Sequence, residues 1–134
     1  MGDRANFGFR QSDGNIIYLY GHWAGEGMMN TLAEAIAKAR PRWTDESYAT
    51  RICISQIIGN EWQEETGWGI STSIGDNEHS IPIVDWESQA VALYEADWNT
   101  SSVEFTEVTL NRTPKFAMGL EAFINKFAKY LTTV

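Results

Sequence analysis

The chain has 134 residues, of which 43% are apolar and 21% are charged, and its formal net charge at pH 7 is −8. This composition excludes an intrinsically disordered chain and is typical of a single globular domain spanning residues 1–134. The acidic balance also excludes general binding to nucleic acid, because such binding depends on lysine and arginine displacing phosphate counterions.

The first predicted element is a β-hairpin formed by residues 5–10 and 15–22. The turn between them, residues 12–15, reads Ser-Asp-Gly-Asn, and such residues adopt the left-handed dihedrals that hairpin turns need. Residues 16–20 are apolar on both faces of the second strand. We therefore expect that strand to lie in the centre of a sheet.

Two helices are predicted after the hairpin. Apolar residues recur at intervals of three and four between residues 29 and 43, and Pro41 should end this first helix near Ala39. Thr44 is a suitable N-cap for the second helix, which should stop at Gly59. A short turn between the two makes a helical hairpin the expected arrangement.

The C-terminal half is predicted to contain four strands and one helix. The strands are expected at residues 66–74, 81–86, 89–94 and 103–110. Alternation in the first of them predicts a half-buried strand, and Pro82 suits an edge strand or a strand start. Thr113 and Pro114 should cap the last helix. Its apolar stripe is predicted to consist of Phe116, Leu120, Phe123, Ile124, Phe127 and Leu131.

This order of elements predicts an α+β fold, with a mostly antiparallel sheet of five to six strands covered by three helices. The single cysteine, Cys53, excludes an intrachain disulfide and is predicted to be a buried thiol among isoleucines. No stretch reaches the length that spans a bilayer, and no apolar run follows Met1. A cytoplasmic protein without a membrane partner is therefore expected.

The first candidate binding site is the glycine-rich turn at residues 21–27, which includes His22, Trp23 and Gly25. A turn from a strand into a helix presents backbone N–H groups that can bind an anion, and His22 could assist. The spacing matches neither the phosphate-binding loop of nucleotide triphosphatases nor the dinucleotide fingerprint. The alternative is that the glycines only permit a tight turn.

The second candidate is the polar segment Asp76, Asn77, Glu78 and His79. Carboxylates beside a histidine can hold a metal or perform acid–base chemistry, because imidazole titrates near neutral pH. Consecutive residues rarely all point at one atom, so a polar hairpin loop is the alternative. A fold that brings His22 and His79 together would favour the chemical role.

The third candidate is a group of arginines beside aromatic residues, a combination suited to phosphates, carboxylates or a stacked base. The group consists of Arg40, Arg42, Arg51, Trp43 and Tyr48. Arg51 can instead pair with Glu46 or Asp45 along a helix. Both interpretations stay open.

The chain has six tryptophans, and in a domain of this size not all of them can be fully buried. One or two are therefore expected at a functional surface. The sequence shows no nucleophile elbow, catalytic carboxylate pair or zinc ligand set, so no catalytic residue, metal or cofactor is predicted. A non-enzymatic role is favoured, and the question of an activity stays open.

Four segments resemble a family of small accessory proteins encoded by bacteriophages of actinobacteria, especially mycobacteriophages. They read IIYLYGHWAGEG, RPRWTDESYATRI, ETGWGIS and DNEHSIPIVD and lie between residues 15 and 86. The resemblance brings no established fold, activity or catalytic residues. It implies a setting, namely a phage accessory protein in the cytoplasm of a bacterial host.

Three functions follow from these features. The first is a binding protein that engages a host or phage macromolecule, most simply a protein. The second is a protein that binds or sequesters a small anionic ligand, such as a nucleotide or phosphorylated metabolite, through Arg42, Arg51 and the glycine-rich turn. The third is a hydrolase or metal enzyme that uses His22, Asp76 and His79. A homodimer is compatible with each of them.

Overall fold

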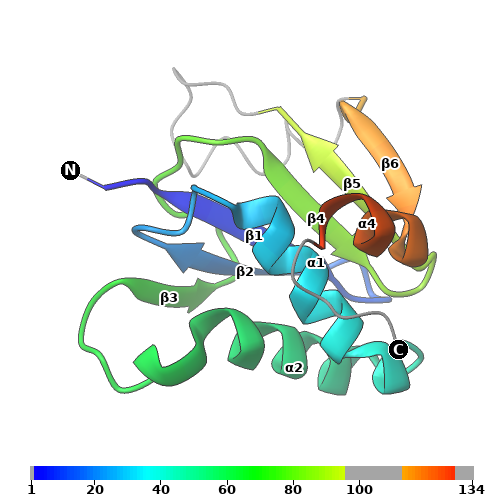
Figure 1. Cartoon of the computed structure of the whole chain (residues 1–134), viewed down its shortest axis with the longest axis horizontal. Helices are drawn as coiled ribbons and strands as arrows, with labels where there is room; N and C mark the ends of the chain where they lie inside the picture. The colour runs from blue at the N-terminus through cyan, green and yellow to red at the C-terminus, as the bar shows by residue number, and fades with distance from the viewer. Residues whose placement is uncertain (1, 96–112, 129–134) are drawn as a thin grey trace.

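Six strands form one mixed sheet in the order β3-β2-β1-β4-β5-β6 (Figure 1). The computed structural model describes residues 2–95 and 113–128. The β1–β4 pair is parallel and the other neighbouring pairs are antiparallel, which confirms the predicted α+β fold. The strands are β1 (Ala5–Arg10), β2 (Ile16–Gly21), β3 (Trp68–Ser71), β4 (Ile81–Asp85), β5 (Ala90–Tyr94) and β6 (Phe116–Gly119).

The helices that the structure describes cover one face of this sheet (Figure 1). They are α1 (Met28–Lys38), α2 (Glu46–Ile58) and α4 (Leu120–Phe127), with short 3-10 turns at Arg40–Arg42 and Gly59–Glu61. As predicted, α1 ends just before Pro41 and α2 ends at Gly59. The N-cap position of α2 is occupied by Asp45, one residue after the expected Thr44, and the Asp45 side chain makes no capping hydrogen bond.

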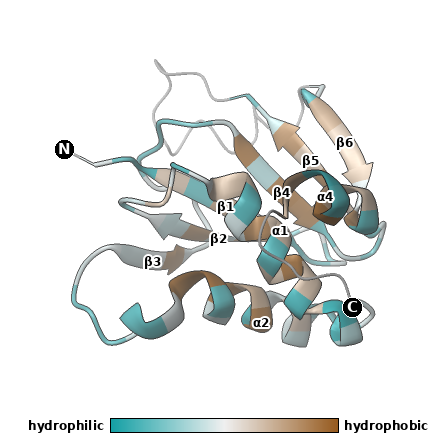
Figure 2. Cartoon of the chain, in the orientation of Figure 1, coloured by the Kyte–Doolittle hydropathy of each residue, from teal (hydrophilic) through white to brown (hydrophobic). Residues whose placement is uncertain are grey.

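The core lies between the helices and the sheet, where hydrophobic segments of α1, α2 and the strands meet (Figure 2). Phe7 and Phe9 of β1 contribute two large, fully buried rings. Cys53 on α2 is buried as predicted, and this burial raises the pKa of its thiol, which makes the thiol unreactive. The opposite face of the sheet has its own buried cluster of Ile16, Tyr18, Ile74, Ile81 and Ile83. Burial on both faces explains why β2 is apolar along its length.

The predicted last helix was wrong at its start. Residues 116–119 form β6 and pair with β5, with Phe116 opposite Leu93 and Gly119 opposite Ala90. The helix begins only at Leu120. Backbone pairing with β5 is a tertiary contact, and it overrides the local helix signal of Thr113 and Pro114.

One further expectation needs correction. Strand β3 is shorter than predicted and lies at one end of the sheet, and Ile70, which was expected on the buried face of a half-buried strand, is exposed. Pro82 is near the start of its strand, one of the two positions expected for it, and β4 is an interior strand. Pairing of β4 with β1 begins at Ile83, so the missing N–H of Pro82 lies outside that ladder.

The strand predicted at residues 103–110 lies outside the described residues, as does Leu131 of the predicted helical stripe. Across residues 2–95 and 113–128, none of the helices combines the length and the apolar character needed to cross a bilayer.

Candidate functional site

The N-terminal segment joins two of the predicted sites. The Asp3 carboxylate accepts the backbone N–H of Glu26 at 2.6 Å and lies 2.5 Å from Nε2 of His79. The Gly25 N–H donates to the Asp3 carbonyl at 2.9 Å. A Cβ atom at Gly25 would overlap both Asp3 and the His79 ring, which explains the glycine. Asp3 thus occupies two N–H groups that were predicted to bind an anion.

Both candidate histidines contact this segment, but they have different partners. His22 lies beside Gly2, and its Nδ1 is 2.8 Å from the Tyr20 hydroxyl. His79 lies on the Asp3 carboxylate. The described part of the chain contains no group of three His, Cys, Asp or Glu side chains arranged to hold a metal ion. The two histidines of the predicted hydrolase or metal site therefore bind different partners and do not form one common site with a third ligand in the described residues.

Asn6, a fully buried side chain of β1, holds the 75–79 loop. Its Nδ2 donates to the carbonyls of Gly75 and Asp76 and to Oδ1 of Asn77, at 3.3, 3.2 and 3.1 Å, and its Oδ1 accepts the Gly75 N–H at 3.0 Å. The Asn77 side chain also donates to the His79 carbonyl. Asp76 and Asn77 thus take part in the architecture of the loop.

Arg4 binds the same loop through charge. Its backbone N–H and its Nε donate to Oε1 of Glu78 at 2.9 and 3.1 Å, and its guanidinium is 3.5 Å from Asp76. The hydrogen bond from the Arg4 backbone, followed by those of its side chain, lowers the pKa of Glu78. The same carboxylate raises the pKa of Arg4. The acidic residues of the second candidate site are therefore paired within the fold.

The arginines of the third candidate site have separate surroundings. Arg40 forms a two-point ion pair with Glu121, at 3.1 and 2.8 Å, and its guanidinium lies 5.3 Å from the centre of the Trp43 ring. Arg42 lies 5.2 Å from the centre of the Tyr48 ring. These contacts are intramolecular cation–π pairs.

Arg51 lies apart from those pairs, in a hollow of about 290 Å³ that it lines with Lys38. Within the described residues neither Asp45 nor Glu46 pairs with it. Glu46 instead accepts the backbone N–H and the hydroxyl of Ser12, at 2.6 and 2.8 Å. The weak helical pairing considered for Arg51 is thus absent from this part of the structure.

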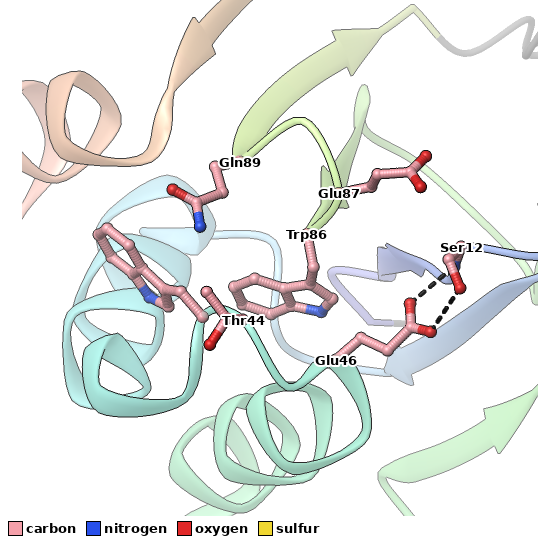
Figure 3. Close-up of a pocket in the computed structure, with 7 residues that line it drawn as sticks. Ser12, Thr44, Glu46, Trp86, Glu87 and Gln89 are labelled. Carbon is pink, nitrogen blue, oxygen red and sulfur yellow. Dashed lines mark hydrogen bonds between the residues drawn. The ribbon is translucent and has the colours of Figure 1, made fainter.

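A second hollow, of about 330 Å³, lies beside Trp86 and Gln89 (Figure 3). Trp86 is almost fully buried, and its indole N–H donates to Oγ1 of Thr50 at 2.9 Å. The charged residues lining the hollow are acidic, Glu46 and Glu87. An anionic ligand is therefore unsuited to it. Its lining consists of Ser12, Trp43, Thr44, Glu46, Trp86, Glu87 and Gln89.

Three of the four large hydrophobic side chains that are exposed in the described residues gather at a different place, around the open edge of the sheet, and the fourth, Tyr48, lies elsewhere. Trp23, Trp62 and Ile70 are 65%, 50% and 52% exposed, and all three line hollows that also contain Trp68. A hollow of about 440 Å³ lies between Trp23 and Trp68, and one of about 150 Å³ lies against Trp62 and Ile70. Both hollows are bordered by two carboxylates. We call Trp23, Trp62, Trp68 and Ile70, with Glu61 and Glu64, the tryptophan face.

Local backbone geometry builds this face. Gly67 has a φ of +100°, a conformation that favours glycine, and its carbonyl accepts the His22 N–H at 2.8 Å. The Trp23 ring lies beside Gly67, and the His22 ring packs edge-on against Trp23 with 4.5 Å between ring centres. The Trp68 indole N–H donates to Oε1 of Glu61 at 2.8 Å. Two rings on either side of Gly67 are thus held apart, with the larger hollow between them.

Comparison of the chain with protein-family models, curated proteins and solved structures gave no match. The resemblance to actinobacteriophage accessory proteins therefore stays a prediction. Any function must be inferred from the side chains and their arrangement.

Sequence reasoning found only part of the tryptophan face. Trp23 was a candidate residue, but Trp62, Trp68 and the two carboxylates were not. The sequence signal for this surface was the number of tryptophans, six, which is more than a domain of this size can fully bury. Ile70 was misleading, because the alternation placed it on the buried face of a half-buried strand, whereas β3 lies at the edge of the sheet and Ile70 is exposed.

Proposed function

We propose that this chain is a non-enzymatic binding protein that engages a partner protein through the tryptophan face. The supporting observation is the clustering of exposed Trp23, Trp62 and Ile70 around Trp68 at one edge of the sheet. Contiguous exposed apolar side chains with a polar rim are typical of interaction sites, and tryptophan is enriched at their centres. In the setting that the resemblance implies, the partner is a host or phage protein.

The exposed area is large enough to matter energetically. Trp23 and Trp62 leave 65% and 50% of their surface in water. For side chains of this size, covering those parts would remove roughly 250–300 Å² of surface from water. At about 25 cal/mol per Å² this contributes on the order of 6–7 kcal/mol, before the costs of association are subtracted. A micromolar affinity needs about 8 kcal/mol after those costs, so the partner must also contact other parts of this surface.

The test compares variants of exposed residues on and off the face. Trp62→Ala and Ile70→Ser each remove one exposed apolar side chain of the face. Tyr48→Ala is the matched control, because Tyr48 is 51% exposed but lines neither hollow of the face. Each tagged protein is incubated with mycobacterial lysate, and retained proteins are quantified by mass spectrometry. Thermal unfolding should shift little in all three variants, since exposed side chains contribute within about 0.5 kcal/mol.

We expect one protein to be retained in stoichiometric amount by the wild type and by Tyr48→Ala, and to be lost with the two face variants. Retention by all four proteins would exclude the face as the binding surface. Sedimentation of the purified chain measures whether it associates with itself. Self-association that Trp62→Ala abolishes would make the face a homodimer interface instead.

The hollow beside Lys38 and Arg51 supports the second candidate function, binding of a small anion. The two cationic side chains line it together, and neither has a carboxylate partner within the described residues. Inorganic phosphate and a nucleotide panel at millimolar concentration should raise the unfolding temperature of the wild type but not of Arg51→Gln. An unchanged unfolding temperature of the wild type would exclude this function.

A further inference from the structure

Strand β3 lies at the edge of the described sheet, beside the tryptophan face, and pairs there with β2 alone (Figure 1). His22 donates its N–H to the Gly67 carbonyl, and in an antiparallel pair every second residue repeats this orientation. Gly69 therefore also faces β2. The N–H and C=O groups of Trp68 and Ile70 point the other way, to the open side of β3, which is the last strand in the described sheet. Such an edge can pair with an added strand.

The side chains beside this edge favour a cationic occupant. Neither hollow of the tryptophan face is lined by a lysine or arginine within the described residues, whereas Glu61 and Glu64 line both. Glu61 is bonded to the Trp68 indole, but the side chain of Glu64 has no partner in the described part of the chain. A lysine or arginine side chain in the larger hollow would place its stem against the indole rings and its charge near Glu64. A phosphate or carboxylate would be repelled there.

The smaller hollow has a different character. Ile58, Trp62 and Ile70 contribute its apolar lining, which suits an aliphatic side chain. The two hollows share Glu61, Glu64 and Trp68, so they are neighbours along the same edge. In an extended segment, residues two apart lie on the same face about 7 Å from each other. A basic and an aliphatic residue two positions apart would therefore both lie on the face of an added strand that is next to these hollows.

We propose that the partner presents an extended segment of this pattern, which adds to β3 as a further strand. Its lysine or arginine side chain enters the hollow between Trp23 and Trp68 beside Glu64, and its aliphatic side chain packs against Trp62 and Ile70. The inference rests on the proposed function, because it describes what the partner brings to the same face. It adds that the segment of the partner is extended and basic and that part of its binding comes from backbone hydrogen bonds.

The test uses defined peptides with the full chain. The probe is an acetylated and amidated peptide of sequence Thr-Lys-Thr-Val-Thr-Lys-Thr, and two relatives serve as comparisons. One has both lysines replaced by glutamate, and the other is N-methylated on alternate backbone nitrogens so that it cannot pair as a strand. Binding is followed by tryptophan fluorescence and by the ¹H–¹⁵N signals of Trp68 and Ile70. Glu64→Gln tests the counter-charge, and Glu65→Gln is the matched control, since Glu65 lines neither hollow.

We expect the lysine peptide to bind, to shift the Trp68 and Ile70 amide signals, and to bind about tenfold more tightly than the glutamate peptide. Glu64→Gln should weaken it by about fivefold, and Glu65→Gln should leave it unchanged. Equal binding of the lysine and glutamate peptides would overturn the charge preference, and equal binding of the N-methylated peptide would overturn strand addition. Absence of binding at millimolar peptide would overturn the inference as a whole. None of these three results decides the proposed function, which is tested separately by retention of the lysate partner and by sedimentation of the purified chain.

Discussion

Asn6 provides the sharpest test of how the fold holds the 75–79 loop. Its buried amide has two N–H groups directed at three oxygens of the loop, and its own oxygen accepts the Gly75 N–H at 3.0 Å. Asn6→Ala removes all of these bonds without disturbing the backbone of β1. The loop groups would then lose their partners inside the protein.

The size of the effect follows from the number of bonds lost. Two donors and one acceptor correspond to about three hydrogen bonds, each with a net contribution of about 1 kcal/mol. We therefore expect the free energy of unfolding in urea to fall by about 3 kcal/mol, and the unfolding temperature to fall by roughly 10 °C. Asn15→Ala is the control, because Asn15 is exposed and its amide bonds only to Asp13. It should cost less than about 0.5 kcal/mol.

Asn6→Asp keeps the side-chain volume and so separates the loss of hydrogen bonds from the loss of packing. A carboxylate at this position would face the carbonyls of Gly75 and Asp76 and Oδ1 of Asn77, so its charged form is disfavoured and its pKa should rise. A group with a raised pKa stabilises the fold at low pH and loses that contribution as the pH rises. At pH 7 the aspartate variant should be less stable than the alanine variant, and acid should narrow the difference. Two variants of equal stability, with no dependence on pH, would refute the assigned hydrogen bonds.

Three other changes have defined outcomes. Thr50→Val removes the acceptor of the buried Trp86 indole N–H, so unfolding in urea should become easier by about 1–2 kcal/mol; a change near zero would contradict this bond. The pKa of Glu78 is lowered from its ordinary 4.5, mainly by the Arg4 backbone N–H, so this carboxylate stabilises the fold above pH 4.5 and loses its contribution as the pH falls through the lowered pKa. Glu78→Gln should therefore weaken the acid dependence of the unfolding temperature, and an unchanged acid profile would argue against the pairing. Burial raises the pKa of Tyr18 from 10.0 to about 12, so its stabilising effect is complete below pH 10 and is lost as the pH rises toward 12. In Tyr18→Phe the unfolding temperature should therefore fall less between pH 10 and pH 12 than it does in the wild type. An equal fall in both proteins would contradict the raised pKa of Tyr18.

The parts of the fold that were predicted correctly have local causes. The 12–15 turn, Pro41 and Gly59 act on their own neighbours, so they mark the hairpin and the ends of α1 and α2 wherever those elements pack. The wrong start of the last helix has a distant cause. Whether Phe116 continues a helix or joins a strand depends on β5, with which residues 116–119 pair.

The candidate sites show the same division. Residue types alone indicated His22, His79 and the arginines as reactive or anion-binding groups, but they could not show that Asp3 lies against His79 or that Glu121 binds Arg40. Those partners are 76 and 81 residues away along the chain. Chain separation of this size leaves no local pattern to detect.

The sequence by itself determined the fold class, the helical hairpin, the interior position of β2 and the presence of more tryptophans than a core of this size can enclose. These follow from composition and from periodicity, which operate over a few residues. Only the tertiary structure decided which tryptophans stay exposed. Trp23 follows β2, Trp62 follows α2 and Trp68 begins β3, and they meet because β3 closes one end of the sheet beside the end of α2. These residues meet because of the strand order, and that order depends on pairing between segments far apart in the sequence, here β2 with β3.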